Sequence, residues 1–503
     1  MAETLLELYH ISKNFDGVKA LEEVNLTLNK GEIHCLAGEN GSGKSTLIKI
    51  ISGFYKNDAG AIRFDGKIQK SLSVMESIRL GIQVIYQDFS IFPNLTVMEN
   101  IAMNHELFYR KKLVNWKKVR KIAGESLEHI GISIPLDETV EHLSVADKQL
   151  VAIARSILYN ARLIIMDEPT SALTRREVDK LFRIIRQLQS EGITILFVSH
   201  KLDEVFEIAD RFTVLRNGKV IVTKSADTIN NDTFIYYMTG RQIKEDYFNA
   251  VDKDIDRCFF RVENLSLSHA FKDISFAIHP GEILGITGLL GSGRTELAKT
   301  LFGLYRADGG TIYVDSVPVQ IRNPQDAMKH GIAYVPEDRL TEGLFLNQSI
   351  KDNLAISAID RLVRKRGMVN EILLEKNVYA WVEKLAIKLN KLSDPISTLS
   401  GGNQQKAVLG KWLETRPKVL ILNGPTVGVD IGSKFDIHVL LRTLAAEKNM
   451  AIILISDDIA EVLKNCNRIL IIDRGRIVDE QINTALDENQ LTAMVIKQEE
   501  GGQ

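Results

Sequence analysis

The sequence predicts an α/β fold that occurs twice along the chain, each time as a domain with a mostly parallel central sheet. The first observation is an internal repeat, because Gly38 matches Gly288 and Lys44 matches Arg294 at a spacing of 250 residues (288 − 38). The second is that short apolar runs alternate with longer amphipathic stretches, a pattern typical of strands and covering helices. The third is length, since 503 residues exceed what one hydrophobic core usually supports.

A polar, charge-rich stretch separates the two copies. We expect one domain at 1–240 and another at 257–503, joined by a linker at 241–256. The repeat is far longer than the roughly 20 to 50 residues of a solenoid unit. Each copy is therefore expected to be a whole domain.

Composition excludes several classes of protein. Lys and Arg total 63 against 65 Asp and Glu, and this formal net charge of −2 argues against a general binder of nucleic acid or anionic membranes. The apolar runs are much shorter than the roughly 18 to 20 residues that span a bilayer. The N-terminus is acidic, unlike a secretory signal, and the three cysteines are scattered, which indicates a reducing compartment. We expect a cytosolic protein that does not itself cross a membrane.

Each copy contains an expected buried strand, 33–37 or 283–287, that opens directly into a glycine-rich loop and then a helix. A phosphate-binding loop requires this context, because glycines allow close backbone approach and the helix N-terminus faces the anion. The first loop contains Gly38, Glu39, Asn40, Gly41, Ser42 and Gly43, followed by Lys44, Ser45 and Thr46, and the second contains Gly288, Gly291 and Gly293, followed by Arg294 and Thr295.

The first half carries the groups that nucleotide hydrolysis needs. Lys44 is expected to reach the β- and γ-phosphates, and Ser45 to place its hydroxyl on Mg²⁺. The apolar run 163–166 is expected to be a strand that carries Asp167 to the metal and Glu168 to the attacking water. Two adjacent carboxylates are costly to hold at a strand end without a nearby cation, although a solvated surface pair is the alternative.

The second half lacks these carboxylates. Its equivalent strand ends in Asn423 and Gly424. Gly424 cannot accept a proton, and Asn423 brings no negative charge to Mg²⁺. Arg294 keeps a cation that can grip phosphate, so nucleotide binding can survive. We therefore expect the first half to hydrolyse a nucleotide and the second half only to hold one.

The chain resembles the ATP-binding cassette (ABC) family twice over, across nearly its whole length. The motifs follow in order: the phosphate loop, Gln87, a segment at Ser144, the Asp167–Glu168 pair and His200. The resemblance implies that Gln87 contacts the metal and senses the γ-phosphate, that Glu168 is the catalytic base, and that His200 orients water and phosphate. It also implies two tandem P-loop NTPase domains, each with a helical subdomain, with ATP and Mg²⁺ as cofactors.

In this family the Leu-Ser-Gly-Gly signature of one domain acts on the nucleotide held by the other. The second half has the intact signature, whereas the first half has Ser144 without the two glycines. The resemblance therefore predicts one composite site with every component intact and one in which nearly every component has changed. In the intact site Ser400, Gly401 and Gly402 join the first loop, and Phe15 is placed to stack on adenine. The altered site combines Ser144 with Arg294, Thr295, Glu337, Asn423, Gly424 and Asp457.

The segment Pro336–Arg339 and the fused arrangement look like the ATP-binding subunit of bacterial monosaccharide importers. That branch implies a membrane permease as partner, a periplasmic or extracellular sugar-binding protein in the same system, no nucleic acid, and a place on the cytoplasmic face of the cell membrane. Residues 88–93 lie where the family contacts permease helices, although an ordinary surface loop explains them nearly as well. Two rivals stay open: a soluble ABC ATPase acting on ribosomes or nucleic acid, and a nucleotide sensor without a transport role.

Overall fold

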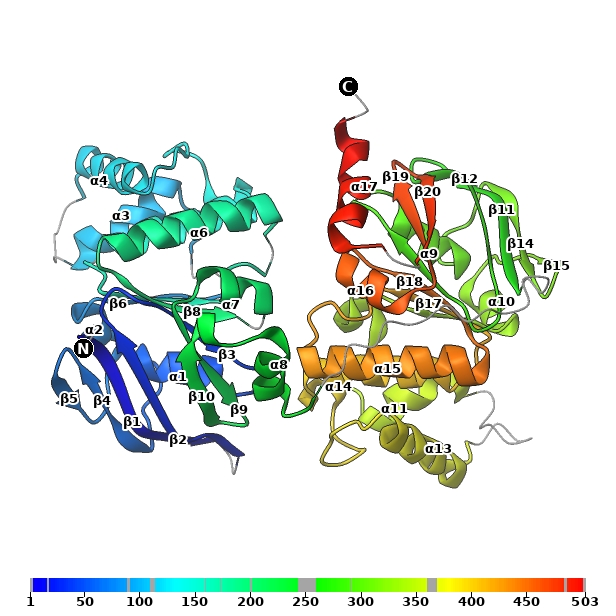
Figure 1. Ribbon diagram of the computed structural model, residues 1–503, viewed down its shortest axis with the longest axis horizontal. Coiled ribbons are helices and arrows are strands. Elements are labelled where there is room, and N and C mark those ends of the chain that lie inside the picture. The colour runs from blue at the N-terminus through cyan, green and yellow to red at the C-terminus, as the bar shows by residue number, and fades with distance from the viewer. Residues whose placement is uncertain are drawn as a thin grey trace. The chain divides into compact units, whose positions relative to one another are not determined.

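The computed structural model describes residues 3–15, 18–87, 91–108, 114–158, 160–171, 173–199, 201–242, 259–289, 291–359, 369–483 and 486–500. The chain divides into two compact units, Met1–Ile243 and Lys244–Gln503 (Figure 1). The linker predicted at 241–256 lies almost entirely outside the described residues, so the predicted domain boundaries stay a prediction.

Unit 1 contains a six-stranded sheet in the order β10-β9-β3-β8-β7-β6. Its neighbouring strands are parallel, except that the edge strand β10 runs antiparallel to β9. This confirms the predicted mostly parallel sheet. The strands are β3 (Ile33–Ala37), β6 (Ile82–Ile85), β7 (Leu163–Asp167), β8 (Thr194–Ser199), β9 (Arg211–Arg216) and β10 (Lys219–Ser225).

A second, antiparallel sheet of unit 1 has the order β2-β1-β4-β5, and the sequence patterns did not predict it. Its strands are β1 (Thr4–Phe15), β2 (Val18–Asn29), β4 (Ala59–Phe64) and β5 (Lys67–Gln69). Helices α3, α4 and α5 contact one another and form the predicted helical subdomain. The helices are α1 (Lys44–Ile51), α2 (Val74–Arg79), α3 (Val97–Phe108), α4 (Trp116–His129), α5 (Val145–Ile157), α6 (Arg175–Ser190), α7 (Leu202–Ile208) and α8 (Asn231–Thr239).

Unit 2 repeats this plan with a six-stranded sheet, β16-β17-β18-β13-β19-β20, and a four-stranded sheet, β12-β11-β14-β15. In the larger sheet only the pair β19 and β20 is antiparallel. The strands are β11 (Phe260–Leu267), β12 (Phe271–Ile278), β13 (Ile283–Thr287), β14 (Gly309–Val314), β15 (Val317–Val319), β16 (Ile332–Val335), β17 (Val419–Asn423), β18 (Ala451–Ile455), β19 (Arg468–Asp473) and β20 (Arg476–Ile482).

The helices of unit 2 follow the same order along the chain. Helices α11, α13 and α14 contact one another and form its helical subdomain. A π-helical turn at Arg339–Gly343 follows β16. The helices are α9 (Arg294–Leu301), α10 (Pro324–Lys329), α11 (Ile350–Ala355), α13 (Glu371–Lys384), α14 (Gly401–Leu413), α15 (Ile431–Lys448), α16 (Ile459–Asn465) and α17 (Glu488–Glu500).

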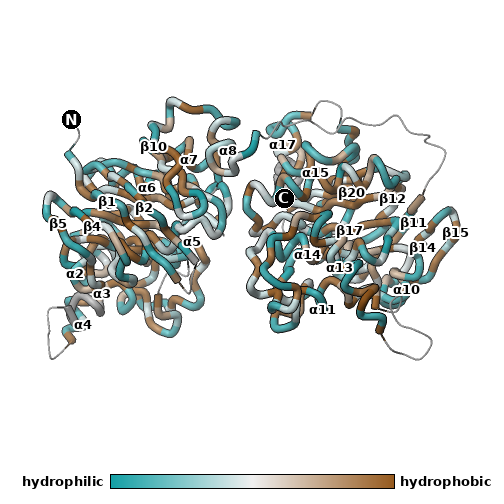
Figure 2. The backbone as a smooth tube through the Cα atoms, turned by 90° about the horizontal axis from the view of Figure 1, so that it is seen from below, coloured by the Kyte–Doolittle hydropathy of each residue, from teal (hydrophilic) through white to brown (hydrophobic). Residues whose placement is uncertain are grey.

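The core of each unit forms where helices cover the sheets. Every residue of β3, β13, β17 and β18 is buried and most are apolar, as expected for parallel strands covered on both faces. Hydrophobic stretches of the chain lie mostly inside each unit, brown in Figure 2. Cys35 and Cys466 are buried free thiols, and Cys258 lies outside the described residues. No helix in the described part of the chain is both long and apolar enough to cross a membrane.

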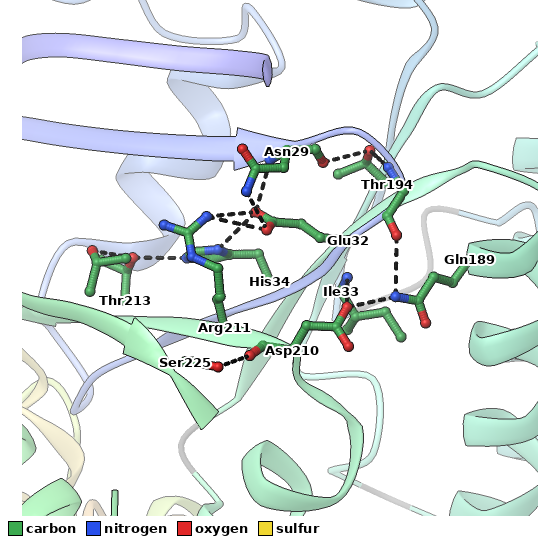
Figure 3. A network of polar contacts seen from close by, with 12 residues as sticks. Asn29, Glu32, Ile33, His34, Gln189, Thr194, Asp210, Arg211, Thr213 and Ser225 are labelled. Atoms are coloured by element: carbon green, nitrogen blue, oxygen red, sulfur yellow. Dashed lines mark hydrogen bonds and ion pairs between the residues drawn. The ribbon is translucent and has the colours of Figure 1, made fainter. Parts of the chain in front are cut away.

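A polar network fixes the start of β3, the strand that leads into the first phosphate loop (Figure 3). The buried His34 ring lies between Glu32 and Thr213, with nitrogen–oxygen distances of 3.2 and 2.8 Å. Arg211 donates to the same Glu32 carboxylate, and the Asp210 carboxylate accepts from the Ile33 amide at 2.8 Å. Burial lowers the pKa of His34, so this histidine is a neutral core residue. The network therefore has a structural role.

Candidate functional site

The predicted catalytic groups of unit 1 meet at one edge of the large sheet. Strands β3, β8, β7 and β6 are parallel neighbours, so their carboxyl ends lie side by side. The first glycine loop follows β3, Asp167 ends β7, and Gln87 comes two residues after β6. His200 directly follows β8 but lies outside the described residues.

The first loop has the geometry of a phosphate cradle. Gly43 precedes α1 with a φ of 106°, which favours glycine. A Cβ at Gly38 would lie 2.3 Å from the Leu215 carbonyl oxygen, so only glycine allows this close approach. The Ser42 hydroxyl is buried, and the described residues give it no hydrogen-bond partner. Together with the α1 N-terminus, these features fit the phosphates of a nucleotide.

Lys44 is the buried cation of this loop. Its ammonium donates to the carbonyl oxygens of Gly38 at 2.6 Å and Glu39 at 3.0 Å. Burial lowers the pKa of Lys44, while the nearby Glu168 and Asp167 carboxylates act in the opposite direction. The loop thus holds a positive charge where phosphate oxygens are expected.

The neighbouring carboxylates fit a divalent cation. Burial, and then the charge of Glu168, raises the pKa of Asp167 to about 6. A cation would favour the charged form and reverse this penalty. The described residues contain no group of three or more His, Cys, Asp or Glu side chains that could hold a metal. The predicted donor set is instead one hydroxyl at Ser45, one carboxylate at Asp167 and one amide at Gln87, which suits Mg²⁺ bound partly through phosphates.

Glu168 has a strained backbone. Its φ is +48°, in the left-handed region that costs a non-glycine residue about 1 kcal/mol or more. Gly424 occupies the equivalent position in unit 2 with a φ of +56°, where glycine carries no such cost. Unit 1 therefore retains a glutamate at a position whose backbone favours glycine.

Sequence reasoning missed Glu204, a buried residue of α7 that joins two parts of the site. Its carboxylate accepts from Thr170 at 2.5 Å and from Ser199 at 2.7 Å. Thr170 lies two residues after Glu168, and Ser199 ends β8. Unit 2 repeats the arrangement, because Glu461 accepts from Thr426 and Ser456. The sequence signal that could have identified this residue is the glutamate at matching places in the two halves, Glu204 and Glu461.

The two signature serines differ in what their hydroxyl groups do. Ser144 donates to the Asp147 carboxylate at 2.9 Å and accepts from the Asp147 amide at 3.1 Å, so its hydroxyl caps its own helix. Ser400 only accepts, from the Asn403 side-chain amide at 2.9 Å. The Asn403 oxygen accepts from the Lys388 amide, which fixes the orientation of that amide group. Within the described residues the Ser400 proton has no acceptor and is available to donate.

The signature glycines also meet packing demands within unit 2. A Cβ at Gly402 would lie 2.1 Å from the Ser433 hydroxyl oxygen, at the start of α15. A Cβ at Gly401 would lie 2.9 Å from the Arg339 guanidinium. The family resemblance implies a phosphate-facing role for these glycines, and the structure adds a steric reason for them.

The second loop is built like the first. Gly288 follows β13, Gly291 has a φ of 80°, and Gly293 precedes α9 with a φ of 95°. The buried Arg294 donates to the Gly288 carbonyl oxygen at 2.9 Å and lies 3.5 Å from the Asp457 carboxylate. Asp457, one of the residues of the predicted altered site, therefore pairs with the loop's own cation.

Phe15, the predicted adenine-stacking residue, ends β1 with 37% of its surface exposed. Its ring packs edge-on against Tyr55 at a centroid distance of 5.2 Å. An exposed aromatic ring is compatible with base stacking, and that role stays a prediction.

Comparison with known proteins identifies relatives over the whole chain. A family model described as ABC transporter matches residues 21–171 and 271–427. A ribose import ATP-binding protein of Caldanaerobacter subterraneus is 40% identical over 95% of this chain and 96% of its own. A putative ribose/galactose/methyl galactoside import ATP-binding protein of Burkholderia cenocepacia is 40% identical over 95% of this chain and 91% of its own. A solved ATP-binding cassette of an ABC transporter in its ADP conformation is 30% identical, covers 47% of this chain and 99% of its own, and has a TM-score of 0.43.

Proposed function

The chain belongs to the ABC transporter family, and we propose that it is the subunit that binds and hydrolyses ATP to energise sugar import through a membrane permease. ATP-binding proteins of import systems are ATPases coupled to transport. The relatives that are named for ribose or galactose import match this chain over 95% of its length, which supports the same class of cargo.

The partners and place in the cell follow from that role. The permease subunits supply the membrane pathway, and a periplasmic or extracellular sugar-binding protein delivers the sugar. This chain then sits on the cytoplasmic face of the cell membrane, needs no sugar pocket, and binds no nucleic acid. The near-balanced charge of −2 supports that last point.

Only one composite site is competent in this proposal. It combines the first loop with Ser400, Gly401 and Gly402. The main support for this proposal is that the intact parts of the site are divided between the two units. The Asp167–Glu168 pair lies in unit 1, whereas the signature serine with an available proton lies in unit 2. Neither unit alone has every part, so the second unit is a required partner for the first loop.

The chemistry at that site uses residues whose surroundings match their tasks. Lys44 binds the terminal phosphates, and Ser400 donates to a phosphate oxygen as its charge grows. Glu168 accepts a proton from the attacking water, and His200 orients that water. Ser45, Gln87 and Asp167 would hold Mg²⁺, which would supply positive charge to neutralise the phosphates. Gly424 leaves the other site without a base at this position.

Reconstitution tests the proposal against both rivals. The chain is assembled in lipid vesicles with the permease encoded beside it. The experiment measures ATP turnover and the uptake of the sugar that the cognate binding protein holds. We expect uptake that needs ATP and the binding protein. Co-purification with ribosomes instead of the permease would favour the soluble ATPase. Negligible turnover with the permease present would favour the nucleotide sensor.

A further inference from the structure

The strand pair β6–β7 of unit 1 and the strand pair β16–β17 of unit 2 have the same register. In unit 1, Ile85 of β6 pairs with Met166 of β7, and Asp167 is the next residue of β7. In unit 2, Val335 of β16 pairs with Leu422 of β17, and Asn423 follows. The residues two positions beyond the paired residues of β6 and β16 are Gln87 and Glu337.

Across this strand pair the amide and the carboxylate have exchanged places. Unit 1 has an amide at Gln87 and a carboxylate at Asp167, whereas unit 2 has a carboxylate at Glu337 and an amide at Asn423. The hydroxyl at the loop is kept, since Thr295 replaces Ser45. Each unit thus presents one hydroxyl, one amide and one carboxylate. The negative charge lost at the end of β17 is restored from the neighbouring strand.

The side chains of unit 2 meet as this exchange requires. The Asn423 amide nitrogen lies 3.5 Å from the Thr295 hydroxyl oxygen and 3.5 Å from a Glu337 carboxylate oxygen. These contacts are long, so they bring the groups together without saturating them. Rotation of the amide would present its oxygen to a cation, and oxygen ligands are those that Mg²⁺ prefers.

Gly424 makes room for Glu337. A Cβ at position 424 would lie 3.1 Å from Glu337 Cγ and 3.6 Å from its Cδ. The Glu337 side chain therefore passes over the α-carbon of the glycine. The same change that removes a base from unit 2 allows its carboxylate to approach from β16.

The loop beside these groups retains an independent mark of phosphate binding. The Ser292 hydroxyl is 3% exposed, and the described residues give it no hydrogen-bond partner. It lies within the loop, where a Cβ at Gly288 would be 3.0 Å from its oxygen. Ser42 has the same property in the first loop.

We propose that the second loop holds a nucleotide together with a divalent cation, and that Glu337 supplies the carboxylate ligand, with Thr295 and Asn423 contributing oxygens. This inference rests on the expectation from the sequence that the second half holds a nucleotide, and it does not depend on sugar transport. The sequence indicated only that Asn423 brings no negative charge to Mg²⁺, and in this proposal Glu337 supplies that charge instead. A Glu337 engaged with the cation is not placed to activate water, so the site binds without hydrolysing.

The test measures cation binding directly in the full chain. Lys44→Ala and Asp167→Asn disable the first site, and the free Mn²⁺ signal is followed by electron paramagnetic resonance with ADP present. We expect one ADP-dependent Mn²⁺ per chain. Glu337→Gln should weaken its binding by about tenfold or more, because a charged ligand is lost. Nucleotide affinity measured in EDTA should stay unchanged.

A charge swap and a matched control make the result decisive. Adding Asn423→Asp to Glu337→Gln recreates the arrangement of unit 1 and should restore Mn²⁺ binding. Glu342→Gln removes a carboxylate of the same segment that pairs with Lys299 instead, and should leave Mn²⁺ binding unchanged. Unchanged Mn²⁺ affinity in Glu337→Gln, or no recovery in the swapped variant with ADP still bound, would overturn the inference. Sugar uptake by vesicles tests the transport proposal separately.

Discussion

Replacing Glu168, the proposed catalytic base, by glycine should stabilise unit 1 while it removes most of the ATP turnover. Glu168 holds a φ of +48°, and this region costs a residue with a Cβ roughly 1 to 2 kcal/mol. Glycine removes that cost but loses roughly 0.5 to 1 kcal/mol through the greater freedom of the unfolded chain. Combining these ranges leaves Glu168→Gly about 0 to 1.5 kcal/mol more stable than a variant that keeps the strained backbone, with a midpoint of about 0.75 kcal/mol.

Glu168→Gln is that matched variant, because it removes the charge and the base but keeps the Cβ and the backbone strain. Both variants lose the repulsion that helps to raise the pKa of Asp167, so the comparison isolates the backbone contribution. Gly424→Ala is the mirror experiment. It adds a Cβ at a φ of +56° and 3.1 Å from Glu337 Cγ, and should destabilise unit 2 by about 1 kcal/mol or more.

Calorimetry of the full chain in EDTA, without nucleotide, measures both effects. For a unit of this size the glycine variant should melt about 1 to 4 °C above the glutamine variant. Both variants should turn over ATP at least about 10² more slowly than the parent chain. A glycine variant no more stable than the glutamine variant would refute the idea that Glu168 is strained for function.

Three further predictions concern single groups. Ser400→Ala should reduce the ATP turnover of the chain assembled with its permease by a factor on the order of 10², because it removes a hydrogen-bond donor to phosphate. Ser144→Ala should leave turnover unchanged and lower the free energy of unfolding by about 1 kcal/mol, because it removes a helix cap. Folding raises the pKa of Asp167 from 3.8 to about 6, so between these pH values the folded state binds a proton that the unfolded state has released. Without divalent cations, the free energy of unfolding of the parent chain should therefore fall relative to that of Asp167→Asn as pH rises from about 4 to about 6, and the difference should then stay constant. Denaturant titrations of both chains across this pH range check the result. Gly402→Ala should lower the free energy of unfolding by about 1 to 3 kcal/mol, because its Cβ would overlap Ser433 at the start of α15. Gly401→Ala should lower it less, because its Cβ would come closest to the end of the Arg339 side chain, and melting experiments compare the two.

The sequence predicted those parts of the site that depend on local pattern. Strands β3 and β13 have the predicted bounds, and the predicted strand at 163–166 extends by one residue to Asp167. The antiparallel sheets were missed because their pairings join segments far apart in the chain, as between β1 and β4. Contacts between distant side chains were also beyond sequence patterns, such as Glu204 with Thr170. So was the strain at Glu168, which depends on a backbone angle.

The most direct test of the single competent site is the steady-state ATP turnover of Glu168→Gln assembled with its permease. In the proposed function Glu168 is the base of the one complete composite site, so turnover should fall by about 10² or more while ATP binding persists. Turnover near that of the parent chain, with the same binding, would contradict the account.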